Sequence, residues 1–121
     1  FRRFLGTQGA GYVPRPAFLT EDAIAMIHDA GGLSVLAHPG AALEEATVEA
    51  LVRQGLRGIE VWHPQHNVAT VRRYRALAHR LGLIETGGSD FHTTARGTPL
   101  GELPVPGSVL INLKHAAGVA G

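Results

Sequence analysis

Apolar and polar residues follow one another along the chain in blocks that predict strands and helices in turn. Three short apolar runs have the length and composition of buried strands: Leu33–Ala37, Gly58–Trp62 and Leu83–Thr86. Longer segments with apolar residues three and four positions apart lie before and between these runs. Their spacing predicts amphipathic helices over residues 20–30, 43–54 and 67–81.

Residues typical of helix ends support these boundaries. Thr20 and Asn67 are good N-caps, and Gly31, Gly55 and Gly82 follow the last expected turns. Strands that alternate with helices over short connections favour parallel pairing with right-handed crossovers. The pattern therefore predicts the α/β class.

The two ends of the chain are richer in glycine and proline. Residues 1–19 indicate an ordered connection, with a short helical turn at Phe1–Leu5. Residues 96–121 contain one further apolar segment, Ser108–Leu113, for which we predict either a last strand or a covering segment.

Polar residues that can perform chemistry follow each predicted strand. His38 comes after the first, His63 and His66 after the second, and Asp90 and His92 after the third. The carboxyl ends of parallel strands share one edge of a sheet, so these side chains are expected to lie close together. Taken singly, a histidine after a strand is more often structural, and an aspartate on such a turn can simply form an Asx-type turn. The coincidence at three strand ends favours a site.

Composition narrows the class of protein and of site. The 121 residues are 45% hydrophobic and 17% charged with a net charge of +1, which favours a folded domain and gives no case for duplex DNA or an anionic membrane. No apolar run is long enough to span a bilayer, and a cytoplasmic location is the default expectation. Without cysteine, metal ligands must be imidazole or carboxylate, a set that suits Mn, Zn or Fe and hydrolytic chemistry.

Three motifs carry a resemblance to a known family. They are Ala37-His38-Pro39, Gly58-Ile-Glu-Val-Trp62 with His63 and His66 after it, and Gly87-Gly-Ser-Asp-Phe-His92. They resemble the later motifs of PHP (polymerase and histidinol phosphatase) domain phosphoesterases, most closely the TrpH/YciV-like branch. The resemblance covers roughly residues 1–95, and Tyr12-Val13-Pro14 is also similar to that branch.

The resemblance implies a distorted (β/α)7 TIM-like barrel, of which this chain would be the C-terminal portion. Residues 1–19 would connect a cap segment to the barrel, residues 20–95 would form its last βα units, and residues 96–121 would be a tail. The His-x-His motif that opens the family is not found in this sequence. We therefore expect the chain on its own to bind metal weakly at best and to have little or no phosphatase activity.

By the same resemblance, His38, Asp90 and His92 align with metal ligands, and a complete domain would hold two or three Mn, Zn or Fe ions. Asp90 is the best candidate to orient the attacking water as well as to ligate. His66, and with it His63, would face the substrate phosphate, although a histidine on a surface loop is nearly as good an interpretation.

Other polar and aromatic residues have two interpretations each. Arg15 can meet a phosphate or be a solvated loop arginine. Glu60 can lie near the site or form a structural ion pair, and the second is preferred. Trp62 is expected in the core or at the barrel rim rather than as a base-stacking platform. The sequence places Arg72, Arg73 and Arg75 on a helix, where we expect a solvated face.

The family implies hydrolysis of phosphate esters, with nucleoside 3′,5′-bisphosphates or oligonucleotide 5′ ends as substrates in this branch. One alternative is a histidinol-phosphatase-like hydrolase. Another is a catalytically silent module that associates with a second copy, with its own N-terminal half or with another partner through exposed sheet edges.

Overall fold

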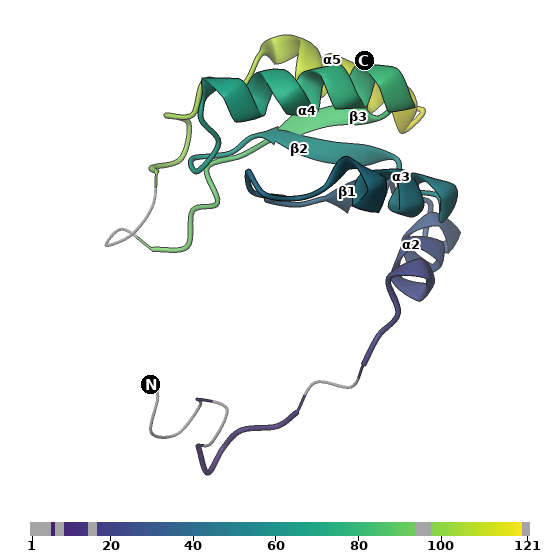
Figure 1. The fold of residues 1–121 in the computed structure, drawn as a ribbon, viewed down its shortest axis with the longest axis vertical. Coiled ribbons are helices and arrows are strands. Elements are labelled where there is room, and N and C mark those ends of the chain that lie inside the picture. The colour runs from purple at the N-terminus through teal and green to yellow at the C-terminus, as the bar shows by residue number, and fades with distance from the viewer. Residues whose placement is uncertain (1–5, 7–8, 15–16, 94–97, 120–121) are drawn as a thin grey trace.

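A computed structural model describes residues 6, 9–14, 17–93 and 98–119 of the chain. Helices and strands alternate from residue 20 to residue 87, and one further helix follows (Figure 1). In chain order they are α2 (Thr20–Asp29), β1 (Val35–Leu36), α3 (Glu45–Arg53), β2 (Gly58–Trp62), α4 (Val68–Leu81), β3 (Ile84–Gly87) and α5 (Gly107–Ala116).

The three strands form one parallel sheet in the order β1-β2-β3. Gly58 of β2 pairs with Val35 of β1 on one side and with Ile84 of β3 on the other. All three strands therefore end at the same edge, which confirms the predicted parallel α/β arrangement. The closed (β/α)7 barrel stays a prediction, since three strands are present among the described residues.

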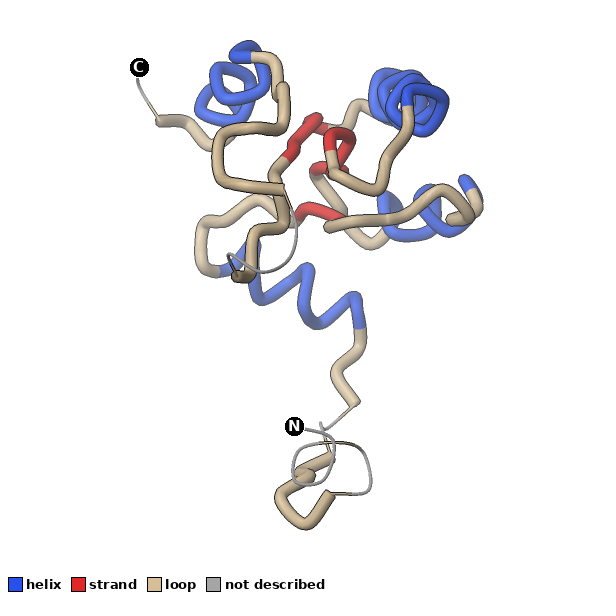
Figure 2. The backbone as a smooth tube through the Cα atoms, turned by 90° about the vertical axis from the view of Figure 1, so that its left-hand side faces the viewer, coloured by secondary structure: helices blue, strands red, loops and turns tan. Residues whose placement is uncertain are grey.

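Helices surround the sheet and bury its apolar residues. Helix α4 packs on β2 and β3, α5 packs on β3, and α3 contacts α4. In Figure 2 the strands lie between the helices, and loops border the sheet on the remaining side. The fully buried centre consists of residues from α3, β2 and α4, namely Val48, Ile59, Val61, Tyr74 and Ala78.

The predicted helix ends at Asn67 and Gly82 are confirmed, and the predicted N-cap at Thr20 is wrong. The Asn67 side chain accepts a hydrogen bond from the Thr70 amide at 2.9 Å, and Gly82 ends α4 with a left-handed φ of 66°. Thr20 is the first residue of α2 rather than its N-cap. Leu19 occupies the cap position and makes no side-chain capping bond.

Of the two interpretations of Ser108–Leu113, the strand is wrong, because this segment belongs to helix α5, which packs on β3. Val109 is buried and Leu113 half-buried, so the inward-facing residues are four positions apart, as a helix requires. Leu110 and Ile111 lie between them and are exposed. The helical turn expected at Phe1–Leu5 lies outside the described residues.

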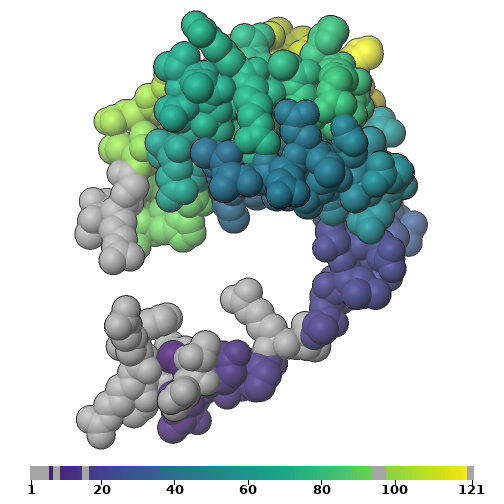
Figure 3. Space-filling model, viewed as in Figure 1, coloured from purple at the N-terminus to yellow at the C-terminus, as the bar shows by residue number. Residues whose placement is uncertain are grey.

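The described residues before α2 extend away from the sheet (Figures 1 and 3). Tyr12 and Val13 are exposed there, and Phe18 and Leu19 are exposed at the start of α2. Among the residues placed in the structure, no helix is both long enough and apolar enough to cross a membrane.

Candidate functional site at the carboxyl edge of the sheet

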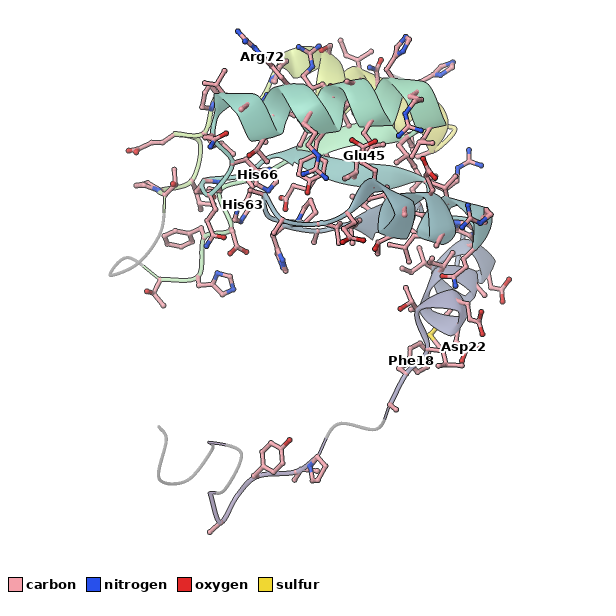
Figure 4. The ribbon with its side chains drawn as sticks, in the orientation of Figure 1. Phe18, Asp22, Glu45, His63, His66 and Arg72 are labelled. Carbon is pink, nitrogen blue, oxygen red and sulfur yellow. The ribbon has the colours of Figure 1, made fainter. Side chains whose placement is uncertain are left out.

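The structure brings together residues that follow all three strands. The ring of His63 lies 6.0 Å from that of His38 and 5.3 Å from that of His66, between ring centroids. The Asp90 carboxylate lies 3.8 Å from Nε2 of His63. Figure 4 shows His63 and His66 side by side at the end of β2. The gathering expected from the sequence is present, with His63 at its centre.

His63 presents an N–H group. Its side chain is buried, and its Nδ1 accepts a hydrogen bond from the Gln65 amide at 3.2 Å. In the neutral imidazole, Nδ1 then carries the lone pair and Nε2 the proton, a tautomer assigned from the partner. Nε2 is buried and has no hydrogen-bond partner among the described residues, because Asp90 at 3.8 Å is too distant. His63 is therefore a donor without an acceptor.

His66 presents the opposite group. Its Nδ1 lies 2.9 Å from the Val61 carbonyl oxygen, which can only accept, so Nδ1 carries the proton. Its Nε2 is left with a lone pair, also buried and without a partner in the described part of the chain. Buried polar atoms are normally hydrogen-bonded, so two neighbouring exceptions point to a ligand-binding site.

His38 sits in a backbone conformation that non-glycine residues seldom adopt, with φ of 33°. Its amide donates a 2.6 Å hydrogen bond to the Glu60 carboxylate on β2. Glu60 thus fixes the start of the loop after β1, whereas the sequence favoured a structural ion pair for it. The sequence did hold a signal for this contact. Glu60 lies two residues before the end of β2, which places its side chain beside the end of the neighbouring strand β1.

Helix α4 holds the rest of this loop. The Tyr74 hydroxyl donates to the Gly40 carbonyl, and Arg73 donates to the carbonyls of Ala41, at 2.8 Å, and of Leu43. Burial raises the pKa of Tyr74 above its ordinary value, an effect partly opposed by the charge of Arg73, so the hydroxyl keeps its proton. Arg73 is therefore a structural contact and not part of a solvated face.

Asp90 and His92 occupy the turn after β3, and both are exposed. Asp90 has a φ of 49°, and His92 Nδ1 lies 2.6 Å from the Asp90 carbonyl oxygen. The two glycines before this turn, Gly87 and Gly88, do not have positive φ. Gly87 is needed for close approach instead: a Cβ there would lie 2.6 Å from Cβ of Trp62.

The predicted metal ligands are only partly assembled. No group of three or more histidine, aspartate or glutamate side chains able to hold a metal occurs among the described residues. His38 and Asp90 instead both approach His63, on which they converge. The chemistry of the donors nevertheless fits a divalent cation, and a histidine that donates Nδ1–H to a carbonyl and keeps Nε2 free, as His66 does, has the usual orientation of a ligand. Arg15 lies outside the described residues.

A polar hollow adjoins the buried histidines. Its volume is about 220 Å³, and it is lined by His63, Pro64, Gln65, Ser89, Asp90 and Thr98. These residues come from the connections after β2 and β3. The hollow therefore has room for a small polar molecule beside both the His63 side chain and the Asp90 carboxylate.

The chain is similar in sequence to several known enzymes. No family model matches the chain. It is 46% identical over 71 residues to a phosphoribosyl 1,2-cyclic phosphate 1,2-diphosphodiesterase from Eggerthella lenta. This match covers 59% of this chain and 27% of that protein. It is 35% identical over 102 residues to a 3′,5′-nucleoside bisphosphate phosphatase from Chromobacterium violaceum, 80% of this chain and 36% of that one. The 5′-3′ exoribonuclease Rnm of Escherichia coli is 34% identical over 106 residues, and the match covers 84% of this chain and 36% of that protein.

Two solved structures resemble this chain in fold as well as in sequence. A protein assigned as a metal-dependent phosphoesterase from Bifidobacterium adolescentis superimposes with a TM-score of 0.73 at 28% identity, over 93% of this chain and 41% of that one. An amidohydrolase from Chromobacterium violaceum, solved with bound sulfate and no metal, gives 0.63 at 30% identity, over 89% and 40%. The matches confirm that this chain resembles the PHP-type metal-dependent phosphoesterases. It spans between 27% and 36% of the length of these curated relatives.

Proposed function

We propose that the protein hydrolyses phosphate esters of nucleotides at the carboxyl edge of the sheet, with nucleoside 3′,5′-bisphosphates or oligonucleotide 5′ ends as substrates. The observation that carries this proposal is a pair of buried imidazole nitrogens, on His63 and His66 beside Asp90, that have no hydrogen-bond partner among the described residues. The relatives support it, since they are named as a phosphodiesterase, a phosphatase and an exoribonuclease.

The two histidines suit different parts of the reaction. The Nε2–H of His63 would donate a hydrogen bond to a phosphate oxygen, which supplies its missing acceptor. The lone pair on Nε2 of His66 would accept a proton from the attacking water as that water bonds to phosphorus. The ester P–O bond breaks in the same reaction, and the leaving alcohol takes up a proton. Asp90 would orient the water, and Arg15 would add a cation near the phosphate.

A divalent metal, Mn, Zn or Fe, is part of the proposal. His38, Asp90 and His92 would hold it, and it would supply positive charge against the phosphate and acidify bound water. Glu60 would position His38 through the hydrogen bond to its amide. Because Tyr74 and Arg73 hold the same loop, the ligand loop is anchored to the core at three points.

Phosphate release from adenosine 3′,5′-bisphosphate with added Mn²⁺ tests this function, on the full-length gene product that contains this sequence. We expect His66→Ala to lower kcat by about 100-fold or more, the usual contribution of a general base. His79→Ala, an exposed histidine on α4, is the matched control and should leave the rate unchanged. Equal rates for the two variants would remove His66 from the mechanism, and no release by the wild type would refute the function.

A further inference from the structure

A second cavity adjoins the site and has no part in the proposed hydrolysis. Its volume is about 230 Å³, and its walls come from β2, α4 and the segment before α5. The apolar side chains that line it are Trp62, Val68, Val71, Leu103 and Pro104. The space equals that of roughly eight water molecules at about 30 Å³ each, which suits one ring system rather than a whole nucleotide.

The cavity and the site share two residues. His63 and His66 line it, and His63 also lines the polar hollow beside Asp90. A molecule with its phosphate at these imidazoles can therefore extend into the cavity. Figure 4 shows the two histidines at the edge of the sheet and Arg72, another lining residue, on α4 above them.

Two of the polar residues of the cavity, Arg72 and Arg75, are cationic, and Arg75 is held in place by its neighbours. The guanidinium of Arg75 lies 5.8 Å from the centroid of the Trp62 ring, and its Nε lies 3.5 Å from the Glu85 carboxylate. A flat cation held over an indole offers a stacking surface that suits an aromatic ring. With Arg72, it also offers N–H donors.

We propose that this cavity binds the base of the nucleotide substrate. The inference rests on the proposed function, which supplies a ligand with a phosphate at one end and a ring at the other. A base matches the apolar walls with its faces, and its ring nitrogens and carbonyl oxygens accept hydrogen bonds from Arg72 and Arg75. An aliphatic group would fill the walls but leave these donors unmatched. Trp62, which the sequence placed in the core or at the rim, becomes a wall of the base site.

Trp62 is also the reporter for the test, because it is the only tryptophan in the chain. The 121-residue chain is titrated in chelator with AMP and with ribose 5-phosphate, which has the same sugar and phosphate but no base. Calorimetry gives both affinities, and fluorescence follows Trp62. We expect AMP to quench Trp62 saturably and to bind at least about tenfold tighter than ribose 5-phosphate.

A pair of variants locates the effect. Arg75→Ala should weaken AMP binding by about fivefold and leave ribose 5-phosphate unchanged, in line with the loss of one stacking cation. Arg53→Ala, at the end of α3, should change neither. Equal affinities for the two ligands, an unquenched Trp62, equal weakening of both by Arg75→Ala, or no binding of either would overturn the base site.

The two proposals fail in different ways. If the full-length gene product releases phosphate from adenosine 3′,5′-bisphosphate while AMP and ribose 5-phosphate bind with equal affinity, the base site is wrong and the function stands. If AMP quenches Trp62 and adenosine 3′,5′-bisphosphate is not hydrolysed, the cavity binds bases and the hydrolytic function is wrong.

Discussion

His63 and His66 differ in the one feature that decides what an imidazole can do, the position of its proton. Each ring has one nitrogen fixed by the backbone, the Gln65 amide in one case and the Val61 carbonyl in the other. These partners make His63 a donor and His66 an acceptor at the buried Nε2 atoms. The sequence could place both histidines after β2, but only the backbone contacts distinguish their roles.

The unusual backbone of His38 and Asp90 was not foreseeable from residue type. Both have positive φ, a conformation that costs of order 1 kcal/mol or more for a residue other than glycine. Gly87 and Gly88 do not have positive φ, although glycine is the usual residue at such positions. That two candidate site residues carry this strain supports a functional constraint on both turns.

Tyr74 gives a prediction for stability against pH. Its neutral form is favoured in the fold, so its contribution is complete below pH 10 and is lost as the pH rises through its raised pKa. Tyr74→Phe should cost about 1 kcal/mol at pH 8, because the hydrogen bond to the Gly40 carbonyl is lost. It should also lose less stability than the wild type between pH 8 and pH 11.

Tyr12→Phe is the control for this measurement, because Tyr12 is exposed and is the only other tyrosine. Urea unfolding at both pH values gives the comparison. The same alkaline loss in the Tyr74 and Tyr12 variants would contradict the assignment of the effect to the buried hydroxyl.

At the scale of elements, apolar periodicity predicted most of the fold. The strand–helix order from α2 to β3 follows from apolar spacing, the Asn67 cap and the Gly82 stop. Helix α5 was missed because Ser108–Leu113 is a short apolar run, and periodicity does not separate a strand from a helix at that length. The packing of α5 on β3 favours the helix, and a local sequence pattern does not reveal this contact.

The contact between β2 and β3 depends on Gly87. A Cβ at this position would approach Cβ of Trp62 to 2.6 Å and its carbonyl oxygen to 2.8 Å, where the register between the strands shifts. Gly87→Ala should therefore cost about 1–3 kcal/mol, as over-packing usually does. Gly88→Ala meets only a Glu60 carboxylate oxygen at 3.7 Å and should be close to neutral. Equal midpoints in urea for the two variants would refute the close approach.

At the scale of the whole molecule, two helices leave apolar side chains in solvent. Met26 on α2 and Leu110 and Ile111 on α5 are more than half exposed. Leu110 and Ile111 are neighbours on α5, and exposed apolar side chains that lie together favour association. Self-association, which the sequence analysis gave as one alternative, remains a prediction, and sedimentation velocity tests it.

We expect the wild type to sediment as a species larger than the monomer and the double variant Leu110→Lys, Ile111→Lys to sediment as the monomer. Asn112→Lys adds a charge at an exposed polar position of the same helix and should not dissociate the assembly. A monomeric wild type would exclude association through this surface.

The central claim is that the residues after the three strands form one metal-dependent site. Equilibrium dialysis against excess Mn²⁺, with bound metal measured by plasma mass spectrometry, tests it most directly. The comparison is between the wild type, Asp90→Ala and Asp29→Ala, an exposed carboxylate at the end of α2. We predict saturable binding to the wild type and to Asp29→Ala and its loss in Asp90→Ala. No binding by the wild type, or undiminished binding by Asp90→Ala, would contradict the account.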